Sequence, residues 1–225
     1  QAFREAVALA HVEWCEYFVV LGDLFDTARP EPQLIAAVQE ILYPCAGSHD
    51  GRAHESQRVG DEDRTMNVYL LLGNHEMVST SPGDHALAPL LAPGVYTQDR
   101  AQRIGPLCLV PFAPGDAGSY VASAVHSEVN RTRGRRYNAD LLAVCVHAGV
   151  RDPRTAPWLW NAPDSVDVDE FASLCAEVGA GYAFAGNWHD RRSWVRIVGS
   201  AEDPSREAAG ATERLGGKGV RVYQL

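Results

Sequence analysis

The chain has 225 residues, 46% of them hydrophobic, and carries a formal net charge of −9. Its length is enough for one large domain or two small ones, and its hydrophobic share suits a packed core. The lack of an apolar run of about 18 residues excludes a membrane-spanning helix, and the negative charge does not favour a DNA-binding surface.

Helical and extended patterns alternate in the first half of the chain. Phe3, Val7, Ala10 and Trp14 fall on one face at helical spacing, whereas the apolar run over 17–21 is typical of a buried strand. The expected elements are an opening helix, a strand that ends at Asp23, a helix that begins at 30–32 and carries Leu34, Ile35, Val38, Ile41 and Leu42, a surface loop over 44–65, and a strand over 66–72.

The alternation continues in the second half, after a proline- and glycine-rich stretch over 79–94. The expected elements are strands over 107–112, 141–146, 182–185, 193–198 and 219–224, helices over 116–127 and 171–178, and a loop over 151–166. A basic loop follows the first of these helices and holds Arg131, Arg133, Arg135 and Arg136. Because strands and helices alternate with no visible boundary, we predict a single α/β domain over 1–225.

Five cysteines are scattered along the chain, and none forms a C-x-x-C pair. An odd number at this spacing does not indicate a disulfide framework. Thiols stay reduced in the cytosol. We therefore expect free, mostly buried cysteines in a cytoplasmic protein.

Four short polar motifs each follow an apolar run: Gly-Asp-Leu-Phe-Asp at 22–26, Gly-Asn-His-Glu at 73–76, His-Ala-Gly at 147–149 and Gly-Asn-Trp-His at 186–189. Open α/β sheets place their sites at the carboxyl ends of strands. Oxygen and imidazole ligands together suit divalent metals such as Mn, Fe or Zn. Asp23 is the strongest candidate, since a carboxylate can bridge two cations about 3.5–4 Å apart. The alternatives are a turn-forming aspartate and structural histidines.

These motifs resemble those of the calcineurin-like metallophosphoesterases, which carry Asp-x-His, Gly-Asp-x-x-Asp, Gly-Asn-His-Asp/Glu, a lone His before a small residue, and Gly-His-x-His. Four of the five are present, between Gly22 and His189. The stretch Gly-Asp-Leu-Phe-Asp-Thr-Ala-Arg-Pro at 22–30 and the tail at 198–223 are similar to the SbcD-type DNA repair nucleases. The resemblance implies a calcineurin-like sandwich of two mixed β-sheets flanked by helices. It also implies two divalent metal ions, Mn²⁺ with Fe, Zn or Mg as alternatives.

The resemblance implies a role for each motif residue. Asp23 would bridge the metals, Asn74, His147 and Asn187 would ligate one of them, and His189 would ligate the other. His75 would act on the leaving oxygen as a catalytic residue, oriented by Asp26. Apart from the resemblance, we expect substrate binding by phosphate-holding arginines and a base-stacking tryptophan, namely Arg131, Arg133, Arg135, Arg136, Arg191 and Trp188. For the arginine loop, a solvated surface is the alternative.

Two features depart from the family pattern. The Asp-x-His motif is absent, and because relatives carry it before the helix that precedes the Gly-Asp motif, we expect it upstream of the sequence as written. Asn187 stands where the family has His, and its carbonyl oxygen is a harder and weaker donor than imidazole. The second metal site is therefore expected to differ in metal preference or affinity.

The leading interpretation is a nuclease of the SbcD type that acts on DNA ends or hairpins by two-metal hydrolysis. The family then implies three partners: DNA, an SMC-like ATPase of the SbcC kind and a second copy of the chain. One alternative is a small-substrate phosphatase or cyclic-nucleotide phosphodiesterase. Another is a catalytically silent DNA-binding or scaffold subunit, which the missing first motif and Asn187 motivate.

Overall fold

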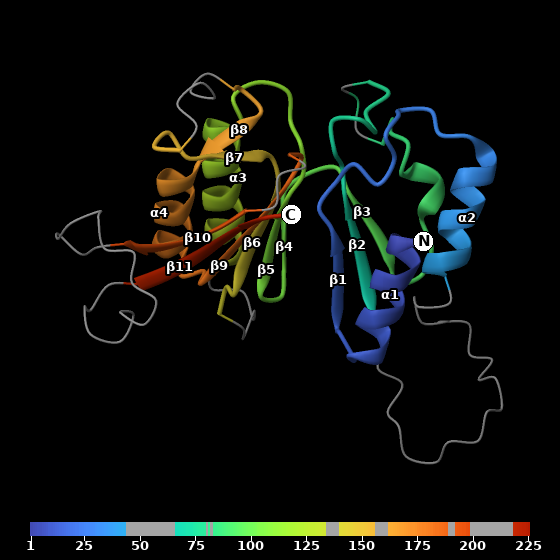
Figure 1. Ribbon diagram of the computed structural model, residues 1–225, viewed down its shortest axis with the longest axis horizontal. Helices are drawn as coiled ribbons and strands as arrows, with labels where there is room; N and C mark the ends of the chain where they lie inside the picture. The colour runs from blue at the N-terminus through green and yellow to red at the C-terminus, as the bar shows by residue number, and fades with distance from the viewer. Residues whose placement is uncertain are drawn as a thin grey trace, which may run out of the picture. The chain divides into compact units, whose positions relative to one another are not determined.

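Figure 1 shows the fold in a computed structural model, which describes residues 1–43, 66–79, 81, 83–133, 140–155, 162–188, 192–198 and 218–225. The chain forms two compact units, Gln1–Asp99 and Arg100–Leu225, each with its own sheet, helices and core. The single domain over 1–225 stays a prediction. The expected loop over 44–65 and four expected site residues lie outside the described residues, namely Arg135, Arg136, His189 and Arg191.

The first unit is a parallel three-stranded sheet with helices on one face. Its elements are α1 (Ala2–Val12), β1 (Tyr17–Val20), α2 (Pro32–Leu42), β2 (Asn67–Leu71), the 3-10 helix η1 (Ala88–Leu90) and β3 (Val95–Gln98). β2 lies between β1 and β3 and pairs with both in parallel. The helices and the sheet share one core, because the apolar stripes of α1 and α2 pack with alternate residues of β2 such as Val68 and Leu70.

β1 and β2 deliver the first two motifs to the same edge of this sheet. The strands are parallel, with Val20 in register with Leu70, so their carboxyl ends lie side by side. Gly22 and Asp23 follow β1, and Gly73 follows β2 two residues past its end. The predicted position of both motifs after strands is confirmed, but only β2 is buried, since the four residues of β1 are half-buried.

The second unit is built on a mixed six-stranded sheet in the order β10-β11-β9-β6-β5-β4. Its strands are β4 (Gln102–Ile104), β5 (Leu107–Val110), β6 (Ala143–His147), β9 (Tyr182–Gly186), β10 (Arg192–Val198) and β11 (Lys218–Gln224). The four inner strands are parallel, and the edge strands β4 and β10 are antiparallel to their neighbours. A separate parallel pair consists of β7 (Gly149–Arg151) and β8 (Ser165–Asp167).

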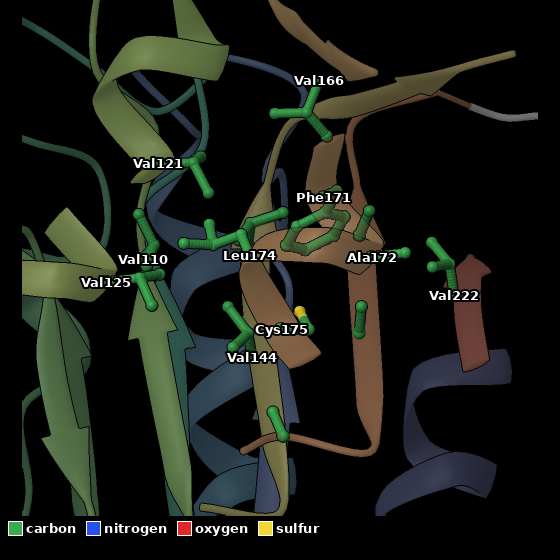
Figure 2. Packing of buried hydrophobic residues seen from close by; sticks show 14 of the residues in the cluster. Val110, Val121, Val125, Val144, Val166, Phe171, Ala172, Leu174, Cys175 and Val222 are labelled. Atoms are coloured by element: carbon green, nitrogen blue, oxygen red, sulfur yellow. The ribbon is translucent and has the colours of Figure 1, made fainter. Parts of the chain in front are cut away.

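Two helices, α3 (Ala117–Thr132) and α4 (Val168–Val178), pack on this sheet in one core (Figure 1). Figure 2 shows Phe171 and Leu174 of α4 lying between Val121 of α3 and Val222 of β11. Local signals fix both ends of α4. The Asp167 carboxylate accepts the Asp169 N–H at 2.9 Å, and Gly179 ends the helix with a φ of 88°.

Most expected helices and strands are confirmed, and the α/β class is confirmed as mixed sheets flanked by helices. The expected helix over 116–127 was too short, since α3 continues to Thr132 and includes Arg131. Four short strands were not predicted, namely β3, β4, β7 and β8. In the part of the chain that the structure describes, no helix is long and apolar enough to cross a membrane. The calcineurin-like sandwich stays a proposal.

The cysteines that the structure describes are free thiols. Cys108, Cys145 and Cys175 are buried, as expected, whereas Cys15 is exposed. Burial raises the pKa of Cys108 and of Cys145 to about 12. These buried thiols are therefore protonated at neutral pH and pack as small apolar groups.

Two aspartates and two arginines form an ion-pair network that ties the end of β7 to α4 and β10. The buried Asp152 carboxylate accepts Arg154 Nε at 2.9 Å and Arg196 Nη2 at 2.9 Å. Asp169 of α4 accepts Arg196 Nε at 2.6 Å. Burial of Asp152 opposes its ionisation, but the hydrogen bonds and charges of both arginines outweigh burial, and the pKa of Asp152 lies below its ordinary value of 3.8.

Asp152→Asn is expected to lower the free energy of unfolding by about 2 kcal/mol at pH 7, because it removes the charge between two arginines. Since the pKa is depressed on folding, the carboxylate stabilises the fold fully above pH 3.8, and this contribution is lost as the pH falls through the lower folded-state value. Urea unfolding at pH 7 and pH 3 measures the effect. A wild-type to variant difference that stays constant between the two pH values would contradict the prediction.

Candidate active site

Glu76 is buried at the carboxyl ends of β1 and β2, where the first two motifs meet. Its side chain is 0% exposed. Oε2 accepts the backbone N–H of Gly73 at 2.8 Å and of Asp23 at 3.1 Å, and Oε1 accepts that of Phe25 at 3.0 Å. Burial raises the pKa of Glu76 above its ordinary value, although these N–H bonds oppose the rise. One carboxylate therefore holds both motif loops together through their backbones.

Asp23 is held in an unusual backbone conformation next to Gly73. Its φ is 52°, in the left-handed region that few non-glycine residues adopt. A Cβ on Gly73 would lie 2.1 Å from Asp23 Oδ1 and 2.4 Å from its backbone nitrogen, so only glycine fits there. Asp23 Oδ1 also accepts the backbone N–H of His75 at 3.1 Å. The Asp23 carboxylate is thus fixed against the second motif, and its role as a metal ligand stays a prediction.

His75 and Asp26 form a side-chain pair at the same edge. His75 Nδ1 lies 2.7 Å from Asp26 Oδ1, and the side chains are 44% and 96% exposed. The carboxylate can only accept, so Nδ1 carries the hydrogen and Nε2 remains for a ligand. The prediction that Asp26 orients His75 therefore has the geometry it requires, although the role of the pair in a reaction stays a prediction.

The first unit brings four of the expected site residues together: Asp23, Asp26, Asn74 and His75. Asn74 and His75 are exposed and Asp23 is half-buried, so the side chains stand at the surface over the buried Glu76. A carboxylate, an amide and an imidazole in adjacent positions could bind a divalent ion and handle a proton.

The third and fourth motifs meet in the second unit. His147 ends β6 in register with Gly186 of β9, and Asn187 follows directly. The His147 side chain is 3% exposed, and its ring lies edge-on to Phe112 at a centroid distance of 6.2 Å. Both motifs therefore stand at strand ends, as the sequence predicted, and the structure shows that the two strands are adjacent and parallel. His189, which completes the fourth motif, lies outside the described residues.

Asn187 and Trp188 are both bonded to Asp164. Asn187 Nδ2 donates to Asp164 Oδ2 at 3.2 Å, and the indole Nε1 of Trp188 donates to the same oxygen at 3.5 Å. The indole lies against Gly149, where a Cβ would be 2.3 Å from the ring. Trp188 is thus packed within its own unit, and its expected stacking on a base stays a prediction.

Gly149→Ala is expected to lower the free energy of unfolding by about 1–3 kcal/mol, because the added methyl group overlaps the Trp188 indole. The matched control is Gly181→Ala, whose Cβ would meet nothing within 4 Å and which we expect to change stability little. Urea unfolding of both variants, alone and combined with Trp188→Leu, measures the clash. An equal effect of Gly149→Ala with and without the indole would contradict the prediction.

Of the two described arginines of the expected basic loop, Arg131 lies in a helix and Arg133 directly follows it. Arg131 lies in the last turn of α3 and donates from Nε and Nη2 to Glu128, at 3.0 and 2.5 Å. Arg133 is the residue that caps this helix. The bond to Glu128 offsets the charge of Arg131 locally, and phosphate binding by these arginines stays a prediction.

Two residues that hold the motifs in place, Asp164 and Gln224, were not assigned a role from the sequence, and Glu76 was left open between a supporting residue and a surface one. The position of Glu76 inside a motif was a signal, but its burial could not be read from one residue. Asp164 lies 23 residues from Asn187 and carries no local pattern. Gln224 is 1% exposed, accepts the Val150 N–H and donates to the Trp188 carbonyl.

Among the described residues, no group of three or more His, Cys, Asp or Glu side chains is placed to hold a metal ion. The predicted ligand set also contains two asparagines, as well as His189 outside the described residues, and it stays a prediction.

No protein-family model matches the chain, and no curated protein matches it by sequence. Among solved structures, the chain is similar to the phosphopantetheinyl hydrolase PptH from Mycobacterium tuberculosis. The sequence identity is 14% and the TM-score is 0.40, over 92% of this chain and 77% of that one. A likeness at this level assigns no activity.

Proposed function

We propose that the protein is a metal-dependent phosphodiester hydrolase of the calcineurin-like kind, and that it acts on DNA as the SbcD-type nucleases do. The observation that supports this best is the 2.7 Å pair between His75 Nδ1 and Asp26 Oδ1, next to the fixed carboxylate of Asp23. Phosphoester hydrolysis requires both a group that handles a proton at the leaving oxygen and acidic ligands for a cation.

The donor chemistry of this edge fits a divalent ion. Asp23 offers a carboxylate and Asn74 an amide oxygen, which suit Mn²⁺, with Mg, Fe or Zn as alternatives. Gly73 lets the Asp23 carboxylate lie close against the second motif, where any Cβ would overlap it. Two bound ions would neutralise phosphate charge and activate water. The ligand roles of His147, Asn187 and His189 remain proposals from the sequence pattern.

His75 has one ring nitrogen for orientation and one for chemistry. Asp26 accepts the hydrogen of Nδ1 and sets the orientation of the ring, which leaves Nε2 to face the substrate. A protonated ring donates from Nε2, so His75 can give its proton to the leaving oxygen or hydrogen-bond to the phosphate. The buried Glu76 keeps the loops of Asp23 and His75 in register while this happens.

The proposal also covers the binding partners of the protein and its location in the cell. It includes DNA as substrate, an SMC-like ATPase of the SbcC kind and a second copy of the chain as partners, and a cytoplasmic location. The net charge of −9 does not help DNA binding, so the proposal relies on bound cations to offset the phosphate charge at the site.

The test is Mn²⁺-dependent degradation of linear duplex and single-stranded DNA, with a chromogenic phosphodiester measured in parallel. The inactive variant is Asp23→Ala, and the matched control is Asp140→Ala, which removes an exposed aspartate outside the motifs. We expect DNA loss by the wild type and the control, none by Asp23→Ala, and none after chelation of the metal.

Three other outcomes would replace the proposal. Hydrolysis of the chromogenic ester without DNA loss would favour the phosphatase or cyclic-nucleotide phosphodiesterase. Inertness on both substrates would favour the silent scaffold subunit. Activity that survives Asp23→Ala would show that another site is responsible.

A further inference from the structure

Asp164 determines which atom of the Asn187 side chain is available to a ligand. An asparagine amide carries a donor nitrogen and an acceptor oxygen, whereas a carboxylate only accepts. Because Asp164 Oδ2 lies 3.2 Å from the amide, the nitrogen must face Asp164. The carbonyl oxygen Oδ1 is therefore turned away from Asp164, and it accepts no hydrogen bond from another residue in the described part of the chain.

The backbone around this contact is held from several directions. Gly149 N–H donates to the carbonyl of Asp164 at 3.0 Å. The buried Gln224 bridges β7 and the fourth motif, accepting from Val150 N–H at 3.2 Å and donating to the Trp188 carbonyl at 3.3 Å. Asn187 itself has a φ of 101°, a conformation that Asn tolerates better than most residues. The amide is thus attached to a supported segment.

We propose that Asp164 is the positioning residue of the fourth motif, and that it commits Asn187 to present an oxygen atom to a divalent cation. The inference rests on the proposed function and adds an ion preference to it. An amide oxygen suits Mn²⁺ or Mg²⁺, whereas the imidazole that the family has here suits Zn²⁺ as well. The site of this chain should therefore favour oxygen-seeking ions.

Two replacements of Asp164 should affect the orientation of the Asn187 amide differently. Asp164→Leu removes the acceptor, so the amide can rotate and present nitrogen, which cannot ligate a cation. Asp164→Asn keeps an oxygen that accepts from Asn187 and Trp188, so it should preserve the orientation. Asn187→Asp offers oxygen from either face, so in the Asp164→Leu background it should restore the ligand.

The experiment is titration calorimetry of the protein with Mn²⁺ and, separately, Zn²⁺. Loss of a residue that orients a metal ligand weakens binding about 10- to 100-fold. We therefore expect Asp164→Leu to weaken Mn²⁺ binding by that factor, and Asp164→Asn and the double variant to stay within about threefold of the wild type. In the metal-free protein, the ¹H–¹⁵N signal of the Asn187 side-chain amide should shift in Asp164→Leu but little in Asp164→Asn.

Asn187→His is a second, independent variant that keeps Asp164. Its imidazole can donate one N–H to Asp164 and offer the other nitrogen to an ion, so the ratio of the Zn²⁺ to the Mn²⁺ affinity should rise at least about tenfold. If Asp164→Leu fails to fold, Asn187→His still tests the inferred ion preference.

Two results would overturn the inference and leave the proposed function standing. One is unchanged Mn²⁺ binding by a folded Asp164→Leu variant, or no recovery in the double variant. The other is an unchanged ion preference in Asn187→His. A wild type that binds neither ion would instead overturn the proposed function, and this inference with it.

Discussion

Glu76→Ala is expected to lower the free energy of unfolding by about 4 kcal/mol or more, the largest effect on stability of any single change described. The side chain is fully buried and accepts three backbone N–H groups from two separate loops. Each buried donor that loses its acceptor costs about 1–3 kcal/mol. This sum is a large share of the roughly 5–15 kcal/mol by which a protein is stable.

Glu76→Gln tests the same reasoning with the shape of the side chain preserved. Its amide nitrogen replaces one of the two accepting oxygens, so at least one N–H faces a donor instead of an acceptor. The neutral amide also removes a buried charge, which offsets part of the loss because burial raises the pKa of Glu76. We expect a decrease of about 1–3 kcal/mol, between the wild type and Glu76→Ala.

Urea unfolding of the three proteins measures this series. Glu40→Ala is the matched control, since Glu40 is an exposed glutamate on α2 of the same unit and should change stability by less than about 0.5 kcal/mol. A Glu76→Ala variant as stable as the control would show that the backbone N–H groups find water or other partners, and that Glu76 does not hold the loops.

The strands that carry the motifs could be predicted because their sequences are continuous apolar runs. Residues 68–71 of β2 and all of β6 are buried, and a buried parallel strand leaves no other pattern. Their carboxyl ends therefore located the motifs correctly. The short strands β3, β4, β7 and β8 have three or four residues each, too few for an alternation to show.

Helix ends were less predictable than helix faces. The stripe through Phe3, Val7 and Ala10 continues in sequence to Trp14, but α1 ends at Val12, and Trp14 is 62% exposed with a φ of 56°. α3 extends past its expected end because two contacts stabilise its polar last turn. Arg131 donates to the Glu128 side chain, and the Thr132 hydroxyl donates to the Glu128 carbonyl. Both contacts join residues three or four positions apart, so this extension of the helix was a local signal that the apolar pattern alone did not include.

The candidate site could likewise be predicted only in part. Residue types gave Asp23, Asn74 and His75 their expected roles, because ligand chemistry is a property of the side chain. The residues that support them act through space: Glu76 reaches Phe25 across 51 positions, and Asp164 reaches Asn187 across 23. A single sequence contains no sign of contacts at such separations.

His75→Ala is expected to lower kcat for DNA hydrolysis by about 10²–10⁴, the usual contribution of a positioned acid or base. This prediction rests on the proposed function. Stability should hardly change, because the His75 ring is 44% exposed and its side-chain partner Asp26 is 96% exposed. Asp26→Asn should lower kcat less, by about 10- to 100-fold, since it frees the ring without removing it. Full turnover in His75→Ala would rule out the assigned role.

The choice of leaving group separates the two roles open to His75. The DNA leaving group is an alkoxide, which departs far more readily with a proton, whereas p-nitrophenolate departs without one. If His75 donates a proton from Nε2, His75→Ala should reduce hydrolysis of DNA much more than hydrolysis of bis(p-nitrophenyl) phosphate. If the ring stabilises charge on the phosphate, both substrates should lose rate to a similar degree. The ratio of the two losses, measured on one preparation with Asp140→Ala as control, therefore identifies what the 2.7 Å pair with Asp26 is oriented to do.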